Sequence, residues 1–378
     1  MQMGSAGIYI HVPFCVSKCA YCDFYSLRYT RGTVDAYVKK TVSVINRWGE
    51  ALQSPADTLY FGGGTPSLLS AEQMIAIINA CKQQFSLQNA EITLEANPAD
   101  RLDSLFEKIA PQGVNRVSLG LQSAVEEELS TLSRRHTAGD IAKAAAAAKA
   151  AGITNLSLDI MLGIPGQTKE SLRRTVEFAL AQNPTHISAY LLTLEPGTPL
   201  YNRRESLPIP DSDAAAELYL YACELLGQAG FERYEISNFA KNGCVSRHNI
   251  KYWTGENYLG IGPAAHSFWN GRRFHYDRDL AGFLSAPRVM QDGTGGGIEE
   301  TVMLRLRLKS GLSLEGVATA YPALVSQDTA ARLRRRIGLF VKAGLADFDG
   351  DTLSLTDRGA LLSNQIISEL LCCLEGAL

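Results

Sequence analysis

The sequence lacks an excess of charge of either sign. Its 36 basic and 39 acidic side chains leave a formal net charge of -3 over 378 residues. A chain with this balance has no overall positive field to draw it to nucleic acid or to an anionic membrane, so any such contact would have to be local. We therefore interpret the four arginines between positions 332 and 336 as a solvated helix surface and expect no nucleic-acid partner.

Long hydrophobic runs are also absent. The first residues, MQMGSAGIYIHVPFC, contain neither a basic segment nor the extended apolar segment of a secretory signal. The alanine-rich run from Ala142 to Ala151 is interrupted by Lys143 and Lys149. We expect a cytoplasmic protein without an integral membrane segment.

Cysteine is scarce, with eight residues in the chain. Without a secretory signal, thiols are more often metal ligands or buried side chains than disulfide partners. Cys81 and Cys223 lie in helical, apolar patterns and are expected to be buried. Cys372 and Cys373 are expected in a terminal helix, with their sulfurs pointing in different directions.

Six short apolar segments alternate with six longer helical patterns. Six strand-then-helix units predict parallel strands with right-handed crossovers. Polar residues cluster where the strands end, which favours a barrel over a doubly wound sheet because barrel loops converge on one face. We therefore predict an α/β fold, a partial (β/α)6 barrel. The expected strands begin at Gly7, Asp57, Ala90, Arg116, Asn155 and His186, and the expected helices span 34–52, 71–86, 100–110, 138–151, 168–182 and 211–229.

The alternation stops near residue 230. We divide the chain into a barrel (1–230), an extension (231–297) and a C-terminal domain (298–378). The extension is expected to form a seventh strand plus loops, and its last segment, QDGTGGG from Gln291 to Gly297, is interpreted as a flexible hinge. The C-terminal domain is expected to be small, mainly helical and winged-helix-like, because helical patterns end in DFDGDTLSLTDRG, a hairpin with an Asp-Gly turn.

The segment CVSKCAYC places Cys15, Cys19 and Cys22 within eight residues. Structural zinc is the alternative, but zinc normally takes four ligands and no fourth soft ligand lies nearby in the sequence. Iron-sulfur clusters usually take four cysteines as well, so a set of three leaves one iron with an open coordination position. The spacing predicts a 4Fe-4S cluster with one iron free to bind a ligand.

Glycines and polar residues at other strand ends fit a ligand beside these cysteines. Gly62, Gly63 and Gly64 let the backbone approach a ligand closely, although a glycine run can also be only a tight turn. Glu95 and Asp159, like the amide Gln122, follow apolar strands, where burial requires a polar partner. Capping of the local backbone is the alternative role for each of the three.

The motif C-x3-C-x2-C resembles that of the radical S-adenosylmethionine (SAM) superfamily. Across nearly the whole chain, YIHVPFCVSKCAYCDF, FGGGTPSLL, LEANP, RVSLGLQS, RRH, DIMLGIPGQT and HNIKYW resemble the oxygen-independent coproporphyrinogen oxidase-like group. The resemblance implies a 4Fe-4S cluster on the three cysteines, SAM on the free iron, a separate electron donor and the capacity for reductive SAM cleavage. By matching motif positions, it implies SAM contacts from Tyr9, Tyr21, Gly63, Gly64, Thr65, Glu95, Gln122, Arg134 and Asp159.

Two departures separate the chain from the oxidases of that group. The oxidases of the group have the motif C-x3-C-x2-C-x-C, whereas Phe24 stands here at the position of the fourth cysteine. They also carry a longer segment before the motif, which here begins at Tyr9. The chain is instead similar to the HemW type of heme chaperone. This implies heme as a ligand and acceptor hemoproteins as partners, including peripheral contact with those in membranes. The alternative is an enzyme that oxidatively decarboxylates coproporphyrinogen.

The segment HNIKYW supplies the candidate heme ligand. The imidazole of His248 can ligate iron, and Tyr252 and Trp253 can pack against a flat macrocycle. On the residues alone, a hydrogen-bonded histidine among core aromatics is favoured, and the resemblance shifts the interpretation toward heme. Cys244, four residues upstream of His248, is a second candidate ligand.

Overall fold

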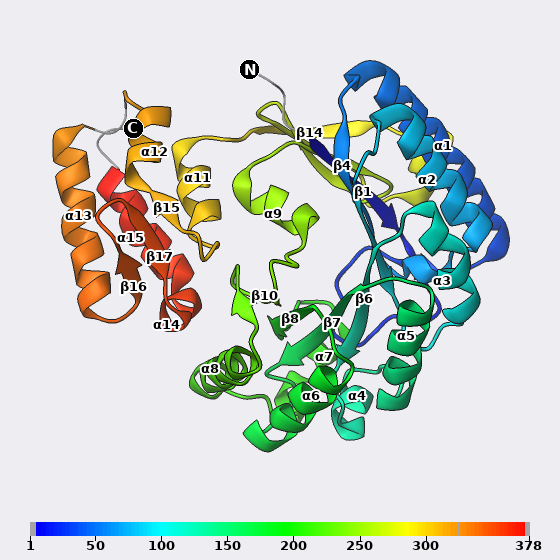
Figure 1. Ribbon diagram of the computed structural model, residues 1–378, viewed down its shortest axis with the longest axis horizontal. Coiled ribbons are helices and arrows are strands. Elements are labelled where there is room, and N and C mark those ends of the chain that lie inside the picture. Colours follow the sequence, from blue (N-terminus) through cyan, green and yellow to red (C-terminus); the bar gives the residue numbers. More distant parts are fainter. Residues whose placement is uncertain (1–4, 324–325, 375–378) are drawn as a thin grey trace.

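The computed structural model describes residues 5–323 and 326–374. Its centre is a curved sheet in which six parallel strands lie side by side in chain order (Figure 1). These strands occupy the six predicted segments, so the predicted partial (β/α)6 barrel is confirmed. They are β1 (Ala6–Val12), β4 (Ala56–Gly63), β5 (Glu91–Ala96), β6 (Arg116–Gln122), β7 (Asn155–Leu162) and β8 (His186–Leu191).

The crossover helices lie along the convex side of this sheet (Figure 1). Local capping fixes where several of them begin: the side chains of Ser70, Thr168 and Asp211 each accept a hydrogen bond from the backbone N–H three residues later. The six predicted helices are present, with two short additional ones. They are α1 (Arg31–Leu52), α2 (Ala71–Phe85), α3 (Asp103–Ile109), α4 (Glu126–Thr131), α5 (Ala138–Ala150), α6 (Lys169–Ala181), α7 (Pro199–Asn202) and α8 (Ser212–Gln228).

The sheet extends well beyond the six units. On one side, β11 (Tyr258–Ile261) pairs in parallel with β1, as the predicted seventh strand, and three antiparallel strands follow it. These are β12 (His266–Trp269), β13 (Arg272–Tyr276) and β14 (Val289–Thr294). On the other side lie β10 (Asn238–Ala240) and β9 (Glu232–Arg233). These antiparallel strands were not predicted from the sequence.

The prediction of a flexible hinge over residues 291–297 is wrong for its first part. Residues 291–294 belong to β14, where Gln291 pairs with Phe274 and Thr294 pairs with Arg272. A register irregularity accompanies Gly293, which has a φ of 109°. Main-chain hydrogen bonds to β13 therefore order a segment whose polar, glycine-rich composition suggested a linker.

The segment HNIKYW was expected among strands and loops, and this expectation is also wrong. It forms α9 (Arg247–Thr254). The Ser246 side chain accepts a hydrogen bond from the backbone N–H of Asn249, and Gly255 ends the helix in a left-handed conformation with a φ of 69°. A serine before a helix and a glycine after it are ordinary boundary signals, and they account for the difference.

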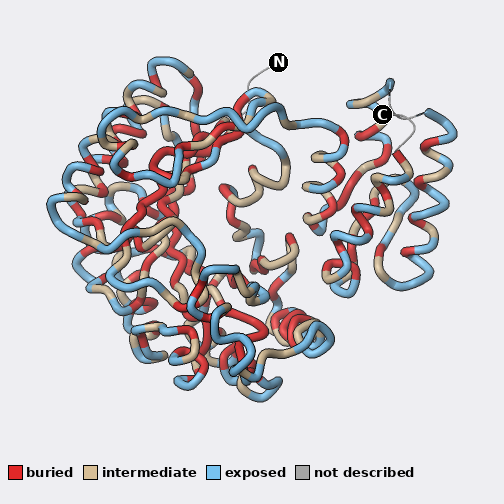
Figure 2. The backbone as a smooth tube through the Cα atoms, turned by 180° about the vertical axis from the view of Figure 1, so that it is seen from behind, coloured by how far each residue is buried: buried red, intermediate tan, exposed pale blue. Residues whose placement is uncertain are grey.

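The last part of the chain packs around its own apolar cluster, which includes Val302, Leu333, Ile337 and Leu353. Buried residues run through its helices and strands (Figure 2). It is mainly helical, and its hairpin falls on the predicted Asp-Gly segment. The helices are α11 (Ile298–Arg305), α12 (Leu314–Ala320), α13 (Gln327–Lys342), α14 (Asp357–Leu361) and α15 (Ser363–Leu374); the strands are β15 (Leu312–Ser313), β16 (Ala346–Phe348) and β17 (Thr352–Leu355). Cys372 and Cys373 lie in α15, as predicted.

Two further local elements complete the fold around the barrel. β2 (Phe14–Cys15) and β3 (Leu27–Arg28) form a small parallel pair that brackets the cysteine loop, and α10 (Leu280–Ser285) follows β13. Within the described parts of the chain, no helix is both long enough and apolar enough to cross a lipid bilayer.

A buried ion pair fastens α9 to the barrel. Arg116 on β6 donates to Glu91 on β5 at 3.0 Å, and both side chains are almost fully buried. The same guanidinium donates to the carbonyl oxygens of Cys244 and Val245, just before α9. Glu91 also accepts from the backbone N–H of His248 at 3.2 Å. One pair of charges thus joins two strands to the start of this helix.

We expect Arg116→Ala to lower the free energy of unfolding by about 3–5 kcal/mol, because it leaves the Glu91 carboxylate buried without its partner. Chemical denaturation measures the change. The matched control is Arg173→Ala, which removes exposed ion pairs to Glu170 and Glu177 and should change stability by less than about 1 kcal/mol. Equal effects of the two substitutions would contradict this role for Arg116.

Candidate iron-sulfur and nucleotide site

The three clustered cysteines lie at the carboxyl end of the barrel strands. Cys15 ends β2, and the following loop carries Cys19 and Cys22, whose backbone N–H donates to the Cys19 carbonyl at 3.3 Å. All three thiols are free and half-buried. Cys81 and Cys223 are buried, as predicted.

Two side chains donate hydrogen bonds to these sulfurs. The hydroxyl of Thr65 donates to Sγ of Cys15 at 3.4 Å, and the guanidinium of Arg134 donates to Sγ of Cys19 at 3.4 Å. Such donors favour the thiolate, which is the metal-binding form of cysteine. Burial raises the pKa of Cys22. Three unpaired thiols, two of them with donors in place, fit an iron-sulfur cluster held by three cysteines.

The cysteines open onto a cavity of about 600 Å³. It lies at the edge where the parallel strands end, so residues far apart in the chain meet there. Of the nine side chains and glycines implied as SAM contacts, the structure brings eight to this cavity: Tyr21, Gly63, Gly64, Thr65, Glu95, Gln122, Arg134 and Asp159. Tyr9 does not line it. Its hydroxyl instead lies 3.0 Å from Nδ1 of His11, and its ring packs against Tyr60.

Several lining residues were missed by the sequence analysis. Tyr190, Leu191 and Glu195 come from the end of β8 and the loop after it, and Asn249 comes from α9. The rule that located the other residues, a polar side chain at the end of a predicted strand, could have found Tyr190. It could not have found Asn249, because α9 was not expected and its approach depends on long-range contacts.

The glycine run allows the loop after β4 to lie against β1. A Cβ atom on Gly64 would stand 2.7 Å from the Phe14 carbonyl oxygen, and one on Gly63 would stand 2.7 Å from the His11 ring. Gly63 also has a φ of 106°. A side chain at Gly63 or Gly64 would therefore clash with its neighbours. Because these residues have no side chain, their backbone groups can face the cavity beside Thr65.

Both signs of charge face the cavity. Burial, reinforced by the Asp159 charge, raises the pKa of Glu95 to about 7, although the Tyr60 hydroxyl donates to it at 2.7 Å. Burial likewise raises the pKa of Asp159, which accepts from Ser118 at 2.9 Å. Arg134 supplies the cation and is held by the Gly120 carbonyl at 2.9 Å. Carboxyl groups and a guanidinium together suit a ligand with an ammonium and a carboxylate, such as an amino acid.

His248 lies in the interior and does not line the cavity. Only 1% of the residue is exposed. Its Nδ1 lies 2.7 Å from the Thr58 hydroxyl, and its Nε2 lies 2.8 Å from the Tyr252 hydroxyl. Its ring stacks on Tyr60 at a centroid distance of 5.1 Å. Heme ligation through His248 would require one of these hydrogen bonds to break and the ring to become exposed. The contacts favour the structural role that was the alternative in the sequence analysis.

Comparison with known proteins identifies the general class of protein to which the chain belongs. The model of the radical SAM superfamily matches residues 9–179, and that of the HemN C-terminal domain matches residues 298–362. Together with the partial barrel and the three cysteines at its mouth, these matches define a radical SAM protein.

Full-length relatives are more specific. The chain is 36% identical to the heme chaperone HemW of Mycobacterium tuberculosis (strain ATCC 25618 / H37Rv) over 97% of this chain and 94% of that protein. It is 33% identical to HemW of Lactococcus lactis over 96% of each protein, and 39% identical to HemW of Escherichia coli over 72% of this chain and 73% of that one. The chain belongs to the HemW family.

The fold also matches a solved structure. Coproporphyrinogen III oxidase (HemN) from Escherichia coli superposes with a TM-score of 0.82, covering 100% of this chain and 91% of the oxidase. The two sequences are 20% identical, so the likeness concerns the fold.

The interior position of His248 has a measurable consequence for acid stability. Burial lowers its pKa to about 3, whereas the unfolded chain binds this proton near pH 6.5. The stability that depends on the neutral ring is therefore present above pH 6.5 and is lost as the pH falls toward 3. Between pH 7.5 and pH 5, wild type should lose about 2 kcal/mol more than His248→Gln, as measured by anaerobic chemical denaturation. If the free energy of unfolding fell equally with pH in wild type and in His248→Gln, the ring would be accessible to protons in the folded protein.

Proposed function

We propose that this protein binds heme and transfers it to acceptor hemoproteins, on a scaffold that holds a 4Fe-4S cluster and SAM. Membership of the HemW family carries the proposal, because relatives named heme chaperones match nearly the full length. The oxidase-like fold alone would not distinguish the two functions, since the same scaffold supports different chemistry.

Phe24 supports the choice between the two candidate functions. It stands at the position where the oxidase motif has a fourth cysteine, and 67% of the residue is exposed at the mouth of the cavity. An exposed aromatic ring is costly to hydrate and offers a face to a planar apolar ligand.

Cys15, Cys19 and Cys22 would hold the cluster. Thr65 and Arg134 would tune it through their hydrogen bonds to the sulfurs, because such donors stabilise the more negative, reduced state. When bound and reduced, a cluster of this type supplies an electron to the sulfonium of SAM.

The cavity residues would hold SAM by its charged amino acid end. Glu95 and Asp159 can accept from an ammonium, Arg134 can donate to a carboxylate, and the backbone around Gly63 and Gly64 can supply further polar groups. Tyr21 and Gln122 complete the lining that the resemblance implies. Tyr9, which lies behind Tyr60, would act by supporting that wall.

The resemblance also leads us to propose the setting in which the protein works. We infer a cytoplasmic protein whose cluster receives electrons from a separate donor protein. Where an acceptor hemoprotein lies in a membrane, the encounter would be peripheral.

Reconstituted protein should contain about four iron and four sulfide per chain, and Cys15→Ala, Cys19→Ala or Cys22→Ala should lose them. Iron analysis and the charge-transfer absorption measure this. The control is Cys372→Ser, an exposed thiol in α15 that should retain the cluster. Stoichiometric zinc without charge-transfer absorption in wild type purified anaerobically would contradict the assignment.

The same reconstituted protein should bind heme and should not convert coproporphyrinogen in the presence of SAM and reductant. A heme titration followed in the Soret region and product analysis of the coproporphyrinogen reaction, run side by side, make the comparison. Turnover of coproporphyrinogen without heme binding would replace the chaperone proposal with the oxidase alternative.

SAM binding should depend on the protonation of Glu95. Its raised pKa of about 7 means that the carboxyl group loses its charge as the pH falls below 7. If it accepts from the SAM ammonium, affinity should fall by up to about tenfold per pH unit below that value. Glu95→Gln should bind SAM more weakly at pH 8 and lose most of this dependence, as measured by equilibrium dialysis. An unchanged pH profile in the variant would exclude Glu95 as the group responsible.

A further inference from the structure

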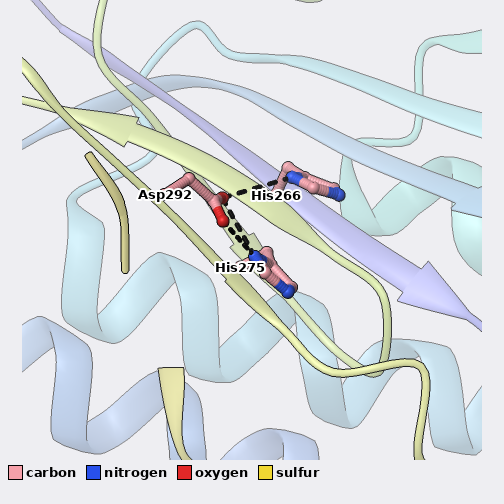
Figure 3. Close-up of side chains that lie close together, drawn as sticks. All are labelled: His266, His275 and Asp292. Carbon is pink, nitrogen blue, oxygen red and sulfur yellow. Dashed lines mark hydrogen bonds and ion pairs between the residues drawn. The ribbon is translucent and has the colours of Figure 1, made fainter. Parts of the chain in front are cut away.

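Three side chains on adjacent strands form a cluster of metal-binding types outside the cavity. They are His266 on β12, His275 on β13 and Asp292 on β14 (Figure 3). One nitrogen from each imidazole and one oxygen of Asp292 all lie within 4.8 Å of one another. Two imidazoles and a carboxylate are a ligand set that suits zinc and related divalent ions. The cluster is therefore a candidate site for such an ion.

Strand pairing brings the two histidines together on an accessible surface. His266 lies directly opposite His275 in the antiparallel register, and their rings stack at a centroid distance of 4.9 Å. Phe274 and Tyr276, on either side of His275 along β13, are buried in the apolar core. Because successive side chains of a strand point to opposite faces, the imidazoles lie on the other face. Their side chains are 68% and 25% exposed, so an ion can reach them from solvent.

An irregularity in β14 supplies the carboxylate. The partners of Gln291 and Gly293 on β13 are consecutive residues, so Asp292 is an extra residue without a partner on that strand. A bulge of this kind re-aims a side chain, and here the Asp292 carboxylate lies between the Nδ1 atoms of the two rings (Figure 3). The φ of 109° at Gly293 lies in a region that glycine adopts readily. The bulge thus completes the set of three ligands.

The distances fit a small ion. The Asp292 carboxylate accepts from Nδ1 of His275 at 2.7 Å and lies 3.7 Å from Nδ1 of His266. Zinc lies about 2.0–2.2 Å from nitrogen and oxygen ligands, so two ligands at a tetrahedral angle stand about 3.4 Å apart. An ion that replaces the proton between His275 and Asp292 lengthens the shorter distance and shortens the longer one. Each change is less than about 1 Å, which exposed side chains make by small rotations.

The charges around the cluster favour a cation. Asp277 places a second carboxylate 3.7 Å from Nε2 of His275. A metal-ligating histidine commonly donates its other ring N–H to a carboxylate, and Asp277 stands on that side of the ring. Arg273, which shares this face of β13, pairs with Glu300 and stacks over the ring of Phe268. Because the Arg273 charge is compensated, the two aspartates determine the local charge.

We propose that His266, His275 and Asp292 bind one divalent ion of the zinc class, through Nδ1 of each histidine and a carboxylate oxygen, with solvent as the fourth ligand. The ion joins β12, β13 and β14, the last of which is the edge strand of the sheet and is mostly exposed. It therefore stabilises a strand that buries little apolar surface of its own. None of these three described residues lines the SAM cavity, so the site is separate from the proposed heme and SAM chemistry.

The test is zinc binding by the full chain with its cluster reconstituted, so that Cys15, Cys19 and Cys22 are occupied. Equilibrium dialysis with metal analysis should find about one zinc per chain in wild type. X-ray absorption at the zinc edge should show imidazole nitrogen and oxygen at about 2.0–2.2 Å and no sulfur at about 2.3 Å. His275→Ala and Asp292→Asn should each bind zinc at least about 10-fold more weakly.

The matched control is Asp347→Asn, which removes an exposed carboxylate from β16 and should bind zinc as wild type does. Hydrogen exchange measures the effect on the edge strand: zinc should slow exchange of the amides of residues 289–294 in wild type and leave it unchanged in Asp292→Asn.

Several outcomes would overturn the proposal. Wild type could bind no zinc, or its zinc could have sulfur neighbours, which would place the ion on cysteine. Equal zinc affinity in wild type, His275→Ala and Asp292→Asn would exclude these ligands. Zinc binding that leaves hydrogen exchange in β14 unchanged in wild type would exclude an ion that joins the three strands.

Discussion

The common direction of the six central strands is the constraint on which the site depends. Because β1 and β4 to β8 are parallel and pair in chain order, their carboxyl ends meet at one edge. Cys15, Glu95 and Asp159, which are distant in sequence, reach one cavity for this reason alone. The helices on the convex side provide the crossovers that make such a sheet feasible, and they leave the opposite face free for ligands.

That free face is closed in part by segments that are not barrel units. The buried pair of Arg116 and Glu91 fixes the start of α9 against β5 and β6, and the rings of Tyr60, His248 and Tyr252 pack between the helix and the strands. Burying a charge pair is favourable only when its hydrogen bonds are made, and here carbonyl and N–H groups next to α9 supply several of them, while Nη1 of Arg116 is buried without a partner among the described residues. The same contacts that position Asn249 at the cavity wall also make His248 inaccessible.

Much of this architecture follows from local sequence. Cys15, Cys19 and Cys22 lie within eight residues, and the six strand-helix units have a strong hydrophobic periodicity. The cysteine site and the barrel could therefore be predicted without knowledge of packing. The antiparallel strands β12 to β14 could not. These strands are short and contain many polar residues or glycines, and successive pairing orders them: β12 pairs with β11, β13 with β12 and β14 with β13. His248 illustrates the same limit, because its burial depends on Thr58, 190 residues away.

The central claim is that the chain passes heme to another protein, and a transfer experiment tests it most directly. Heme-loaded protein is mixed with an apo-hemoprotein in the presence of an excess of a heme-scavenging protein, and the acceptor is then isolated and its Soret spectrum recorded. The account predicts that the acceptor gains heme in spite of the scavenger, because transfer occurs within a protein complex. Heme recovered only on the scavenger, at the rate of its release into solution, would contradict the account.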